Sequence, residues 1–232
     1  MNLNATYIGD AVSAARSLMR AGLWDPALES PAAESGALRA EVLTDRFFWR
    51  LDKAAEAEDA VAALSQDDPA LAGFYDAQLA CTRLLFELDP RPDDEARARA
   101  GLSASVEDER VASWATFWTG IVVERFDDDS ERAKAHYTEA LDSALKDEDL
   151  LLESYAIRHL GALALENGDG TGLDQLRRSY HLRAALGARP QTAAAAAAYA
   201  AELPPGPEAD QLNELAARTA RELRLTWLVQ DQ

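Results

Sequence analysis

The sequence is short of cysteine, of basic residues and of long apolar runs. One cysteine among 232 residues, Cys81, excludes an internal disulfide and a cysteine-rich zinc site. Lysine and arginine together number 23 against 41 acidic residues, which gives a formal net charge of −18. Because non-specific binding to nucleic acids or anionic membranes needs a basic surface, we expect neither nucleic acid nor membrane as a partner.

The chain also lacks a segment that predicts export or membrane insertion. Its first seven residues contain neither a basic stretch nor an apolar run, so we expect no secretory signal. The uncharged run over residues 190–201 is mostly alanine and is too short to span a bilayer. We therefore expect a cytoplasmic protein.

Valine and isoleucine are scarce and no segment alternates convincingly between apolar and polar residues, which argues against a sheet. Alanine, leucine, glutamate and arginine dominate instead, and all four favour helices. The fold class that we predict is all-α, with about ten to twelve helices. Short connections between successive helices force antiparallel neighbours, and hence stacked helical hairpins. The clearest predicted helices cover about residues 7–21, 36–51, 53–64, 69–88, 93–100, 107–126, 130–146, 148–166, 173–186, 191–203 and 208–225. Asp25-Pro26 carries the cap signal of a further helix, Asp68-Pro69 repeats that signal, and Asp129 or Ser130 is the predicted cap of the helix over residues 130–146.

The second half of the chain contains a repeated pattern of small and large residues. Gly120 and Gly161 lie 41 residues apart, each in the middle of a predicted helix. The helix after each glycine carries a small, a large and a small residue at spacings of four and three. Two antiparallel helices approach closely where one carries a small residue and the other offers a notch beside a large side chain. The two sets are Ala133, Tyr137 and Ala140, and Gly172, Leu176 and Ser179.

This pattern resembles a known repeat family. Ile157-x-x-Leu160-Gly161-x-x-Ala164 and Ala133-x-x-x-Tyr137-x-x-Ala140 resemble the two halves of a tetratricopeptide (TPR) repeat. The region is similar to TPR-like parts of large bacterial, especially actinobacterial, transcriptional regulators. The resemblance covers roughly residues 107–225 and is looser before them. It implies irregular N-terminal helical hairpins over residues 1–106 and TPR-like repeats over residues 107–232, in one continuous domain.

The resemblance also implies where a partner would bind. In a TPR-type stack the first helix of each pair lines the concave face, which places Trp114, Phe117, Tyr155 and Arg158 there. Helical spacing puts His159 on the same face as Tyr155. Aromatic residues and arginine are common anchors of binding surfaces. The alternatives are aromatic core packing, an ion pair for Arg158 and a hydrogen-bonded histidine between helices.

Three arginines form a local basic spot on this acidic chain. They are Arg177, Arg178 and Arg183. Arg178 or Arg183 could reach a carboxylate or phosphate of a ligand, and charge balance on a helix exterior is the alternative. We count both among the candidate ligand-binding residues.

No catalytic or metal-binding set emerges from the motifs. Asn167-x-Asp169-x-Thr171-Gly172 imitates the start of a calcium loop, but its twelfth position is Arg178 and not glutamate. The spacing of the three histidines gives no argument for a zinc site. We expect no metal and no cofactor, and we expect Cys81 to be a buried small hydrophobe.

The sequence therefore predicts a non-enzymatic, TPR-like interaction protein. Its concave groove would bind a partner peptide or protein, or a second copy of the chain. The alternative is a small-molecule site around Tyr155, Arg158 and His159, in which His159 could act as an acid or base.

Overall fold

The computed structural model describes residues 3–228, and all regular structure among them is helical. These residues form twelve α-helices and two short 3-10 helices, which confirms the predicted all-α class. The chain divides into two compact units, Met1–Asp108 (unit 1) and Glu109–Gln232 (unit 2). The division falls close to the predicted one after residue 106, and a single continuous domain stays a prediction.

Unit 1 is built from successive short helices that pack in sequence. The helices α3 and α4 form one pair, and α5 and α6 form another, more extensive one. Helix α3 also packs against α5. The elements are α1 (Leu3–Arg20), α2 (Trp24–Leu28), η1 (Pro31–Glu34), α3 (Gly36–Arg50), α4 (Ala54–Leu64), α5 (Pro69–Leu85) and α6 (Asp94–Ser105).

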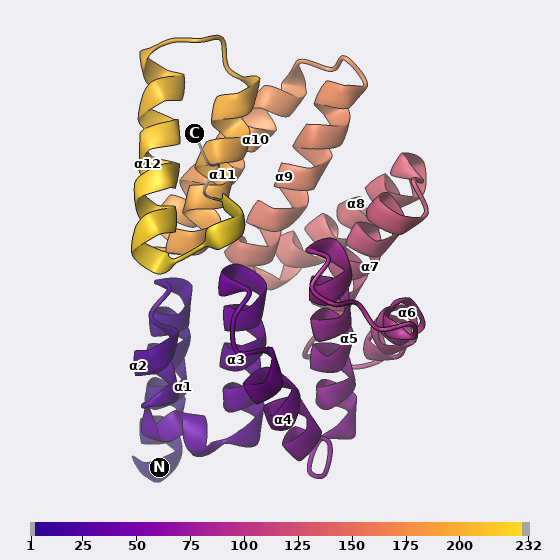
Figure 1. The fold of residues 1–232 in the computed structure, drawn as a ribbon, viewed down its shortest axis with the longest axis vertical. Helices are drawn as coiled ribbons and strands as arrows, with labels where there is room; N and C mark the ends of the chain where they lie inside the picture. Colours follow the sequence, from indigo (N-terminus) through magenta and orange to yellow (C-terminus); the bar gives the residue numbers. More distant parts are fainter. Residues whose placement is uncertain (1–2, 229–232) are drawn as a thin grey trace. The chain divides into compact units, whose positions relative to one another are not determined.

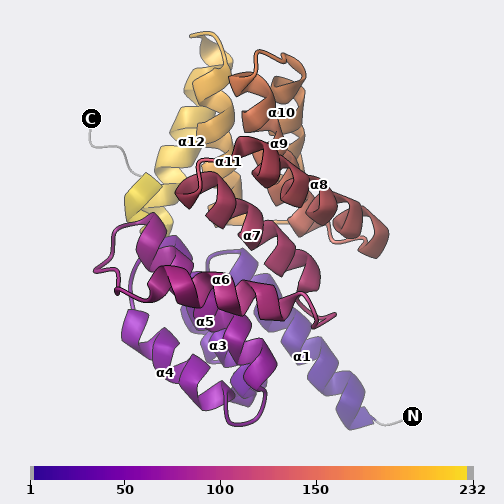
Figure 2. The ribbon, with the colours of Figure 1, turned by 90° about the vertical axis from the view of Figure 1, so that its right-hand side faces the viewer.

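Unit 2 consists of three helical hairpins, and each helix packs against the next along the chain. Figures 1 and 2 show α9 to α12 running alongside one another, with α7 and α8 inclined to them. The order of contacts agrees with stacked helical hairpins. The elements are α7 (Ala112–Phe126), α8 (Ser130–Asp147), α9 (Leu150–Glu166), α10 (Thr171–Ala185), α11 (Arg189–Glu202), α12 (Pro207–Leu223) and η2 (Thr226–Leu228).

The helices of unit 2 approach closely at the glycines of the repeated pattern. A Cβ atom on Gly120 of α7 would lie 2.6 Å from the ring of Tyr137 on α8. On the next pair, a Cβ atom on Gly172 would lie 2.3 Å from the carbonyl oxygen of Gly161. Both distances are shorter than a Cβ atom tolerates, so a larger residue at Gly120 would displace the Tyr137 ring and one at Gly172 would force the helix backbones apart. The predicted packing of small against large residues is thus confirmed for both pairs.

Unit 1 contains a similar close approach that the sequence reading missed. A Cβ atom on Gly101 of α6 would lie 2.8 Å from the Cβ atom of Ala77 and 2.9 Å from the carbonyl oxygen of Gly73, both on α5. The small–large–small pattern is not needed here, because two small residues on α5 admit the glycine of α6. Gly73 and Ala77 are four residues apart on one helix face, which is a signal that could have revealed the notch.

Most helices begin within two residues of their predicted starts, and two predicted caps are confirmed. The carboxylates of Asp68 and Asp129 accept hydrogen bonds from the backbone N–H groups of Leu71 and Arg132, at 3.2 Å and 3.0 Å. Two boundaries were predicted wrongly by five residues: α6 extends to residue 105, and α7 begins only at residue 112. A turn over residues 106–111 separates these two helices.

The predicted cap at Asp25 is also wrong. Helix α2 begins one residue earlier, and its preceding residue, Leu23, makes no side-chain cap. The carboxylate of Asp25 forms an ion pair with the buried guanidinium of Arg46 instead. Arg46, which lies 21 positions further along the chain, is therefore the partner of this carboxylate in place of a backbone N–H at the helix start.

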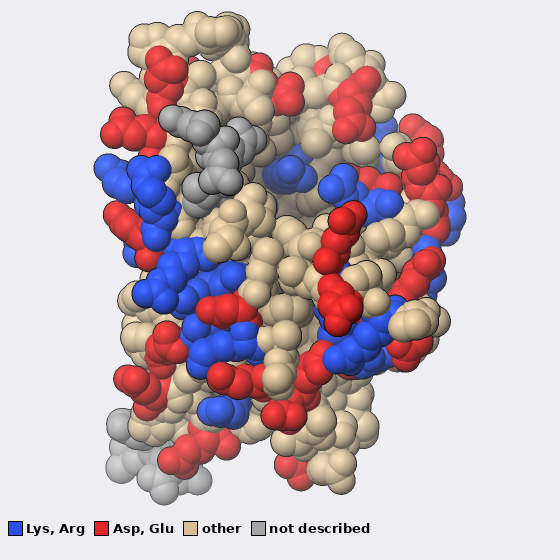
Figure 3. All heavy atoms as spheres, viewed as in Figure 1, with Lys and Arg blue, Asp and Glu red and all other residues tan. Residues whose placement is uncertain are grey.

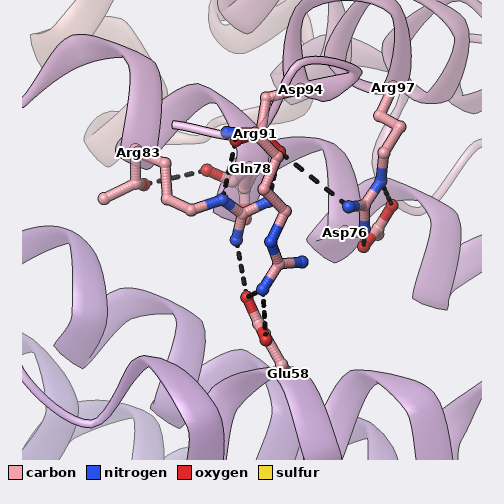
Figure 4. Close-up of polar contacts among 8 residues, drawn as sticks. Glu58, Asp76, Gln78, Arg83, Arg91, Asp94 and Arg97 are labelled. Atoms are coloured by element: carbon pink, nitrogen blue, oxygen red, sulfur yellow. Dashed lines mark hydrogen bonds and ion pairs between the residues drawn. The ribbon is translucent and has the colours of Figure 1, made fainter. Parts of the chain in front are cut away.

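An ion-pair network ties α4, α5 and α6 together in unit 1 (Figure 4). The guanidinium of Arg83 donates to both carboxylate oxygens of Asp94, with Nε 2.8 Å from Oδ2, and to Glu58 at 2.8 Å. Asp94 is fully buried and also accepts a hydrogen bond from the backbone N–H of Arg91 at 2.8 Å. Glu58 in turn accepts from the side chain of Arg91. Because every member has a partner, the network holds this unit together and leaves no charge for a ligand.

Cys81 is buried in the same unit, as predicted, and burial raises the pKa of its thiol to about 12. Among residues 3–228, no helix combines the length and the apolar character needed to cross a bilayer.

Candidate binding site on α7 and α9

Four of the predicted site residues form one aromatic cluster in unit 2. Trp114 and Phe117 lie on α7, and Tyr155 and His159 lie on α9. The ring centroids of Trp114 and Tyr155 are 5.4 Å apart, and Phe117 lies 5.5 Å from both Tyr155 and His159. All three pairs are edge-to-face contacts, at separations favourable for aromatic rings. The predicted faces of α7 and α9 therefore meet.

Asp149 fixes the start of α9 against α7. Its carboxylate accepts hydrogen bonds from the backbone N–H groups of Leu151 and Leu152, at 3.1 Å and 3.0 Å. The other carboxylate oxygen accepts from the indole Nε1 of Trp114 at 3.0 Å. Sequence reasoning missed this residue, although an aspartate directly before an apolar helix is a cap signal. The cap thus also orients the indole of the cluster.

A carboxylate, a phenol and an imidazole meet beside the aromatic cluster. The hydroxyl of Tyr137 on α8 donates to Oε2 of Glu124 at 2.5 Å, and the same oxygen lies 3.2 Å from Nδ1 of His159. Burial lowers the pKa of His159 to about 4, and the neighbouring charge of Arg158 acts in the same direction. The imidazole is therefore neutral at neutral pH, with Nδ1–H donating to the carboxylate.

Glu124 is the charged member of this group. Burial acts against its ionisation, but the hydrogen bonds of His159 and Tyr137 and the charge of Arg158 outweigh it and lower the pKa to about 2. The same carboxylate raises the pKa of the buried Tyr137 hydroxyl further above its ordinary value. The carboxylate charge of Glu124 is therefore already engaged by two hydrogen-bond donors of the protein.

Arg158 contributes a positive charge at the edge of the cluster. One of its terminal nitrogens, Nη1, lies 3.4 Å from both ring nitrogens of His159. Burial lowers the pKa of the guanidinium, while the carboxylate of Glu124 acts against this shift. Among the described residues, no carboxylate forms an ion pair with Arg158.

Arg183 lies beneath the same cluster and is only 3% exposed. Its Nε donates to the hydroxyl of Ser154 at 3.2 Å, and its Nη1 donates to the backbone carbonyl of Gln191 at 3.1 Å. The guanidinium carbon lies 4.3 Å from the ring centroid of Tyr155, a cation–π contact. Burial lowers its pKa to about 10, so the charge persists at neutral pH. Sequence spacing did not indicate that this arginine would be buried.

Arg178 has different surroundings. Its side chain is 61% exposed and forms an ion pair with the buried carboxylate of Glu153. Among the described residues, no hydrogen bond or ring contact joins Arg178 to the aromatic cluster. The structure thus brings six of the seven candidate residues together and leaves Arg178 apart.

The cluster is only partly covered. Phe117 is 1% exposed, whereas Trp114, Tyr155, Arg158 and His159 are all partly exposed. Figure 3 shows a hollow in the surface over α9, with basic atoms inside it. The arrangement can therefore offer aromatic edges and a cation to a bound molecule. It has no exposed nucleophile paired with a base.

A separate shallow pocket of about 590 Å³ lies along α8. It contains none of the candidate residues, and its wall comes from that helix alone: Glu131, Lys134, Ala135, Thr138, Glu139, Asp142 and Ser143. A pocket on one helix flank is a surface feature and does not compete with the cluster as a site.

Within residues 3–228, no group of three or more His, Cys, Asp and Glu side chains is placed to hold a metal ion. In comparisons with family models, curated proteins and solved structures, the chain matches none. The sequential pairing of helices therefore comes from the structure, and the tetratricopeptide resemblance stays a prediction from the repeated pattern.

Proposed function

We propose that this chain is a non-enzymatic, TPR-like interaction protein that binds a peptide or protein segment through the face shared by α7 and α9. The observation that carries the proposal is the partly exposed cluster of Trp114, Tyr155, Arg158 and His159 on two adjacent helices. Tryptophan, tyrosine and arginine are the side chains that dominate binding energy at protein interfaces. The aromatic rings, and the Asp149 cap that holds Trp114, are already fixed by their neighbours. Binding a partner therefore costs little conformational entropy.

The electrostatics of His159 favour binding over catalysis. A general base works best when its pKa lies near the working pH, and the pKa of His159 is about 4. Its Nδ1 is engaged by Glu124, and Arg158 lies over its ring. A small-molecule ligand in the same place is the second candidate, which the buried and uncompensated Arg183 favours.

The test is selection of a displayed random peptide library on the whole purified protein. Bound peptides are then measured by fluorescence anisotropy against wild type and two variants. We expect Trp114→Ala to weaken binding about tenfold or more, because it removes a central aromatic anchor. The control is Leu145→Ala on α8, which removes an apolar side chain that is 52% exposed and leaves the cluster intact.

Failure to select any peptide, or equal binding by Trp114→Ala and wild type, would contradict the proposal. Circular dichroism of each variant confirms that folding is retained. Sedimentation of wild type and of Trp114→Ala, each alone over a range of concentrations, tests whether the partner is a second copy of this chain. If it is, the wild type self-associates and the variant does so less.

A further inference from the structure

The cluster on α7 and α9 contains two positive charges without a counter-ion. Among the described residues, neither Arg158 nor Arg183 has an ion-pair partner. The donors of Arg183 reach only neutral oxygens, those of Ser154 and Gln191. A buried cation that has no anion beside it is costly to the fold, and each of these charges lowers the pKa of a neighbour.

The carboxylate of Glu124 offsets part of this excess but forms no ion pair with either guanidinium. Glu124 already accepts from the Tyr137 hydroxyl and lies beside Nδ1 of His159. Several other arginines of unit 2 are paired: Arg177 bonds to Asp174, Arg178 to Glu153 and Arg189 to Glu222. The remaining described arginines of this unit without an ion pair lie exposed to water, whereas Arg158 is partly buried and Arg183 is buried.

A third polar group at the same place is unsatisfied. The side chain of Gln191 is 3% exposed, and its amide oxygen is buried without a hydrogen-bond partner. The backbone of the same residue bonds to Arg183. Unpartnered buried polar atoms are rare in folded proteins, and this one is an acceptor, so a water or a donor group of the partner segment would satisfy it, and a carboxylate would not.

We infer that Arg158, supported from beneath by Arg183 and Tyr155, is a subsite for one carboxylate group carried by the partner segment. This inference rests on the proposed function and names the chemistry of the partner. A carboxylate matches the planar fork of a guanidinium, and the aromatic edges of Trp114 and Tyr155 can hold the apolar part of the same segment. The subsite would favour acidic partners, although the protein as a whole is acidic.

The local charges favour a carboxylate over a phosphate. Arg158, Arg183 and Arg125 are positive, and the carboxylates that act on Arg158 are those of Glu124 and Glu166. Three positive and two negative charges leave a surplus of one. A carboxylate would neutralise this surplus, whereas a phosphate monoester carries up to about two negative charges at neutral pH.

The experiment uses the peptides selected on the wild-type protein. We expect enrichment of Asp and Glu, and a loss of affinity of about tenfold or more when the critical carboxylate is replaced by its amide. Arg158→Gln should cause a similar loss, and Arg158→Lys a smaller one, because lysine keeps the charge without the fork. The matched control is Arg177→Gln, which makes the same charge change at an exposed ion pair and should alter affinity less than about twofold.

Each other outcome overturns the inference in a distinct way. If the selected peptides need Trp114 but not a carboxylate, the proposed function stands and the inferred carboxylate subsite is rejected. If no peptide is selected, sodium phenylacetate is titrated while tryptophan fluorescence is followed. If phenylacetate then saturates the wild type but not Arg158→Gln, the site binds a small carboxylate and not a carboxylate on a partner segment. That result would reject the proposed function as well. Stronger competition by inorganic phosphate than by acetate at equal ionic strength would reject the carboxylate.

Discussion

Gly161 and Gly172 face each other across α9 and α10, so closely that a Cβ atom on Gly172 would lie 2.3 Å from the carbonyl oxygen of Gly161. Such an atom would also lie 2.7 Å from the side chain of Leu165. Because backbone cannot move aside cheaply, this contact sets the separation of the two helices. The same helices carry Tyr155, Arg158 and Arg183, so the contact also positions the binding site.

Gly172→Ala should therefore destabilise the protein by about 1–3 kcal/mol, because the helices must move apart to admit the methyl group. Gly170→Ala is the matched control. Gly170 has a helical φ of −61°, and no atom lies within 4 Å of its added Cβ. Its substitution should change stability by less than about 1 kcal/mol, with either sign. Urea unfolding followed by circular dichroism measures both, and equal effects would disprove the role of the contact.

Stability should also depend on the protonation of His159. The pKa of this residue is about 4 in the folded protein, against 6.5 for an ordinary histidine. The unfolded chain therefore takes up the proton first as the pH falls. The stability contributed by the neutral, buried imidazole is present above about pH 6.5 and is lost as the pH falls toward about 4.

The expected loss is on the order of 2 kcal/mol between about pH 7.5 and about pH 4.5. Urea unfolding at several pH values measures it, and the difference between wild type and His159→Gln isolates this residue from other acids. His181→Gln is the control, because His181 is exposed and its loss should leave the slope unchanged. A wild-type slope retained in His159→Gln would contradict the prediction.

The sequence was sufficient for features that depend on local spacing. Gly120 and Tyr137 were predictable partners because the small and large residues recur at helical intervals in both pairs. The shared face of Tyr155 and His159 follows from the same interval. Helix ends marked by Asp68 and Asp129 were predictable because an N-cap acts within its own first turn.

Contacts between distant parts of the chain could not be predicted in this way. Asp149 meets Trp114 across 35 positions, and the rotation of α9 against α7 decides that contact. Arg178 and Arg183 lie on the same helix, yet one is exposed and paired while the other is buried without an anion. Their sequence environments are similar, and only the packing of α10 against α9 and α11 distinguishes them.

Asp45 in unit 1 should change the pH dependence of stability in the opposite direction to His159. Burial raises the pKa of this carboxyl to about 7, although the indole Nε1 of Trp24 donates to it at 2.7 Å and Trp49 also bonds to it. A raised pKa means that the folded protein holds the proton more tightly than the unfolded chain. This stabilising contribution is complete below about pH 3.8 and is lost as the pH rises through about 7.

We therefore expect Asp45→Asn to gain stability relative to wild type as the pH rises from about 4 to about 7, with the difference levelling off above about 7. The amide oxygen keeps an acceptor for the indoles and carries no charge. Tryptophan fluorescence follows the urea unfolding, because Trp24 and Trp49 beside Asp45 contribute to the signal. Asp59→Asn serves as the control, because Asp59 is an exposed carboxylate in the same unit. If the difference in unfolding free energy between Asp45→Asn and wild type did not change with pH, the pKa of Asp45 would not be raised in the folded protein, and the prediction would be wrong.

The buried ion pair of Arg83 and Asp94 makes the sharpest test of how unit 1 is held together. Asp94 is fully buried, and Arg83 supplies two of its hydrogen bonds. Arg83→Met would leave a buried carboxylate without its main counter-ion and should cost about 3–5 kcal/mol. Adding Asp94→Asn should recover part of this loss, because the uncompensated charge is then removed.

The control for that pair is Lys53→Met, which breaks the exposed ion pair with Glu56 in the same unit. It should cost less than about 1 kcal/mol, because water screens and replaces the interaction. The free energies of unfolding of all three variants are compared with wild type by urea titration at neutral pH. If Arg83→Met lost no more stability than Lys53→Met, water would have to reach the carboxylate of Asp94. The ion-pair network would then not be what fixes α5 against α6. A double variant no more stable than Arg83→Met would show instead that packing by the arginine side chain, and not its charge, provides the stability.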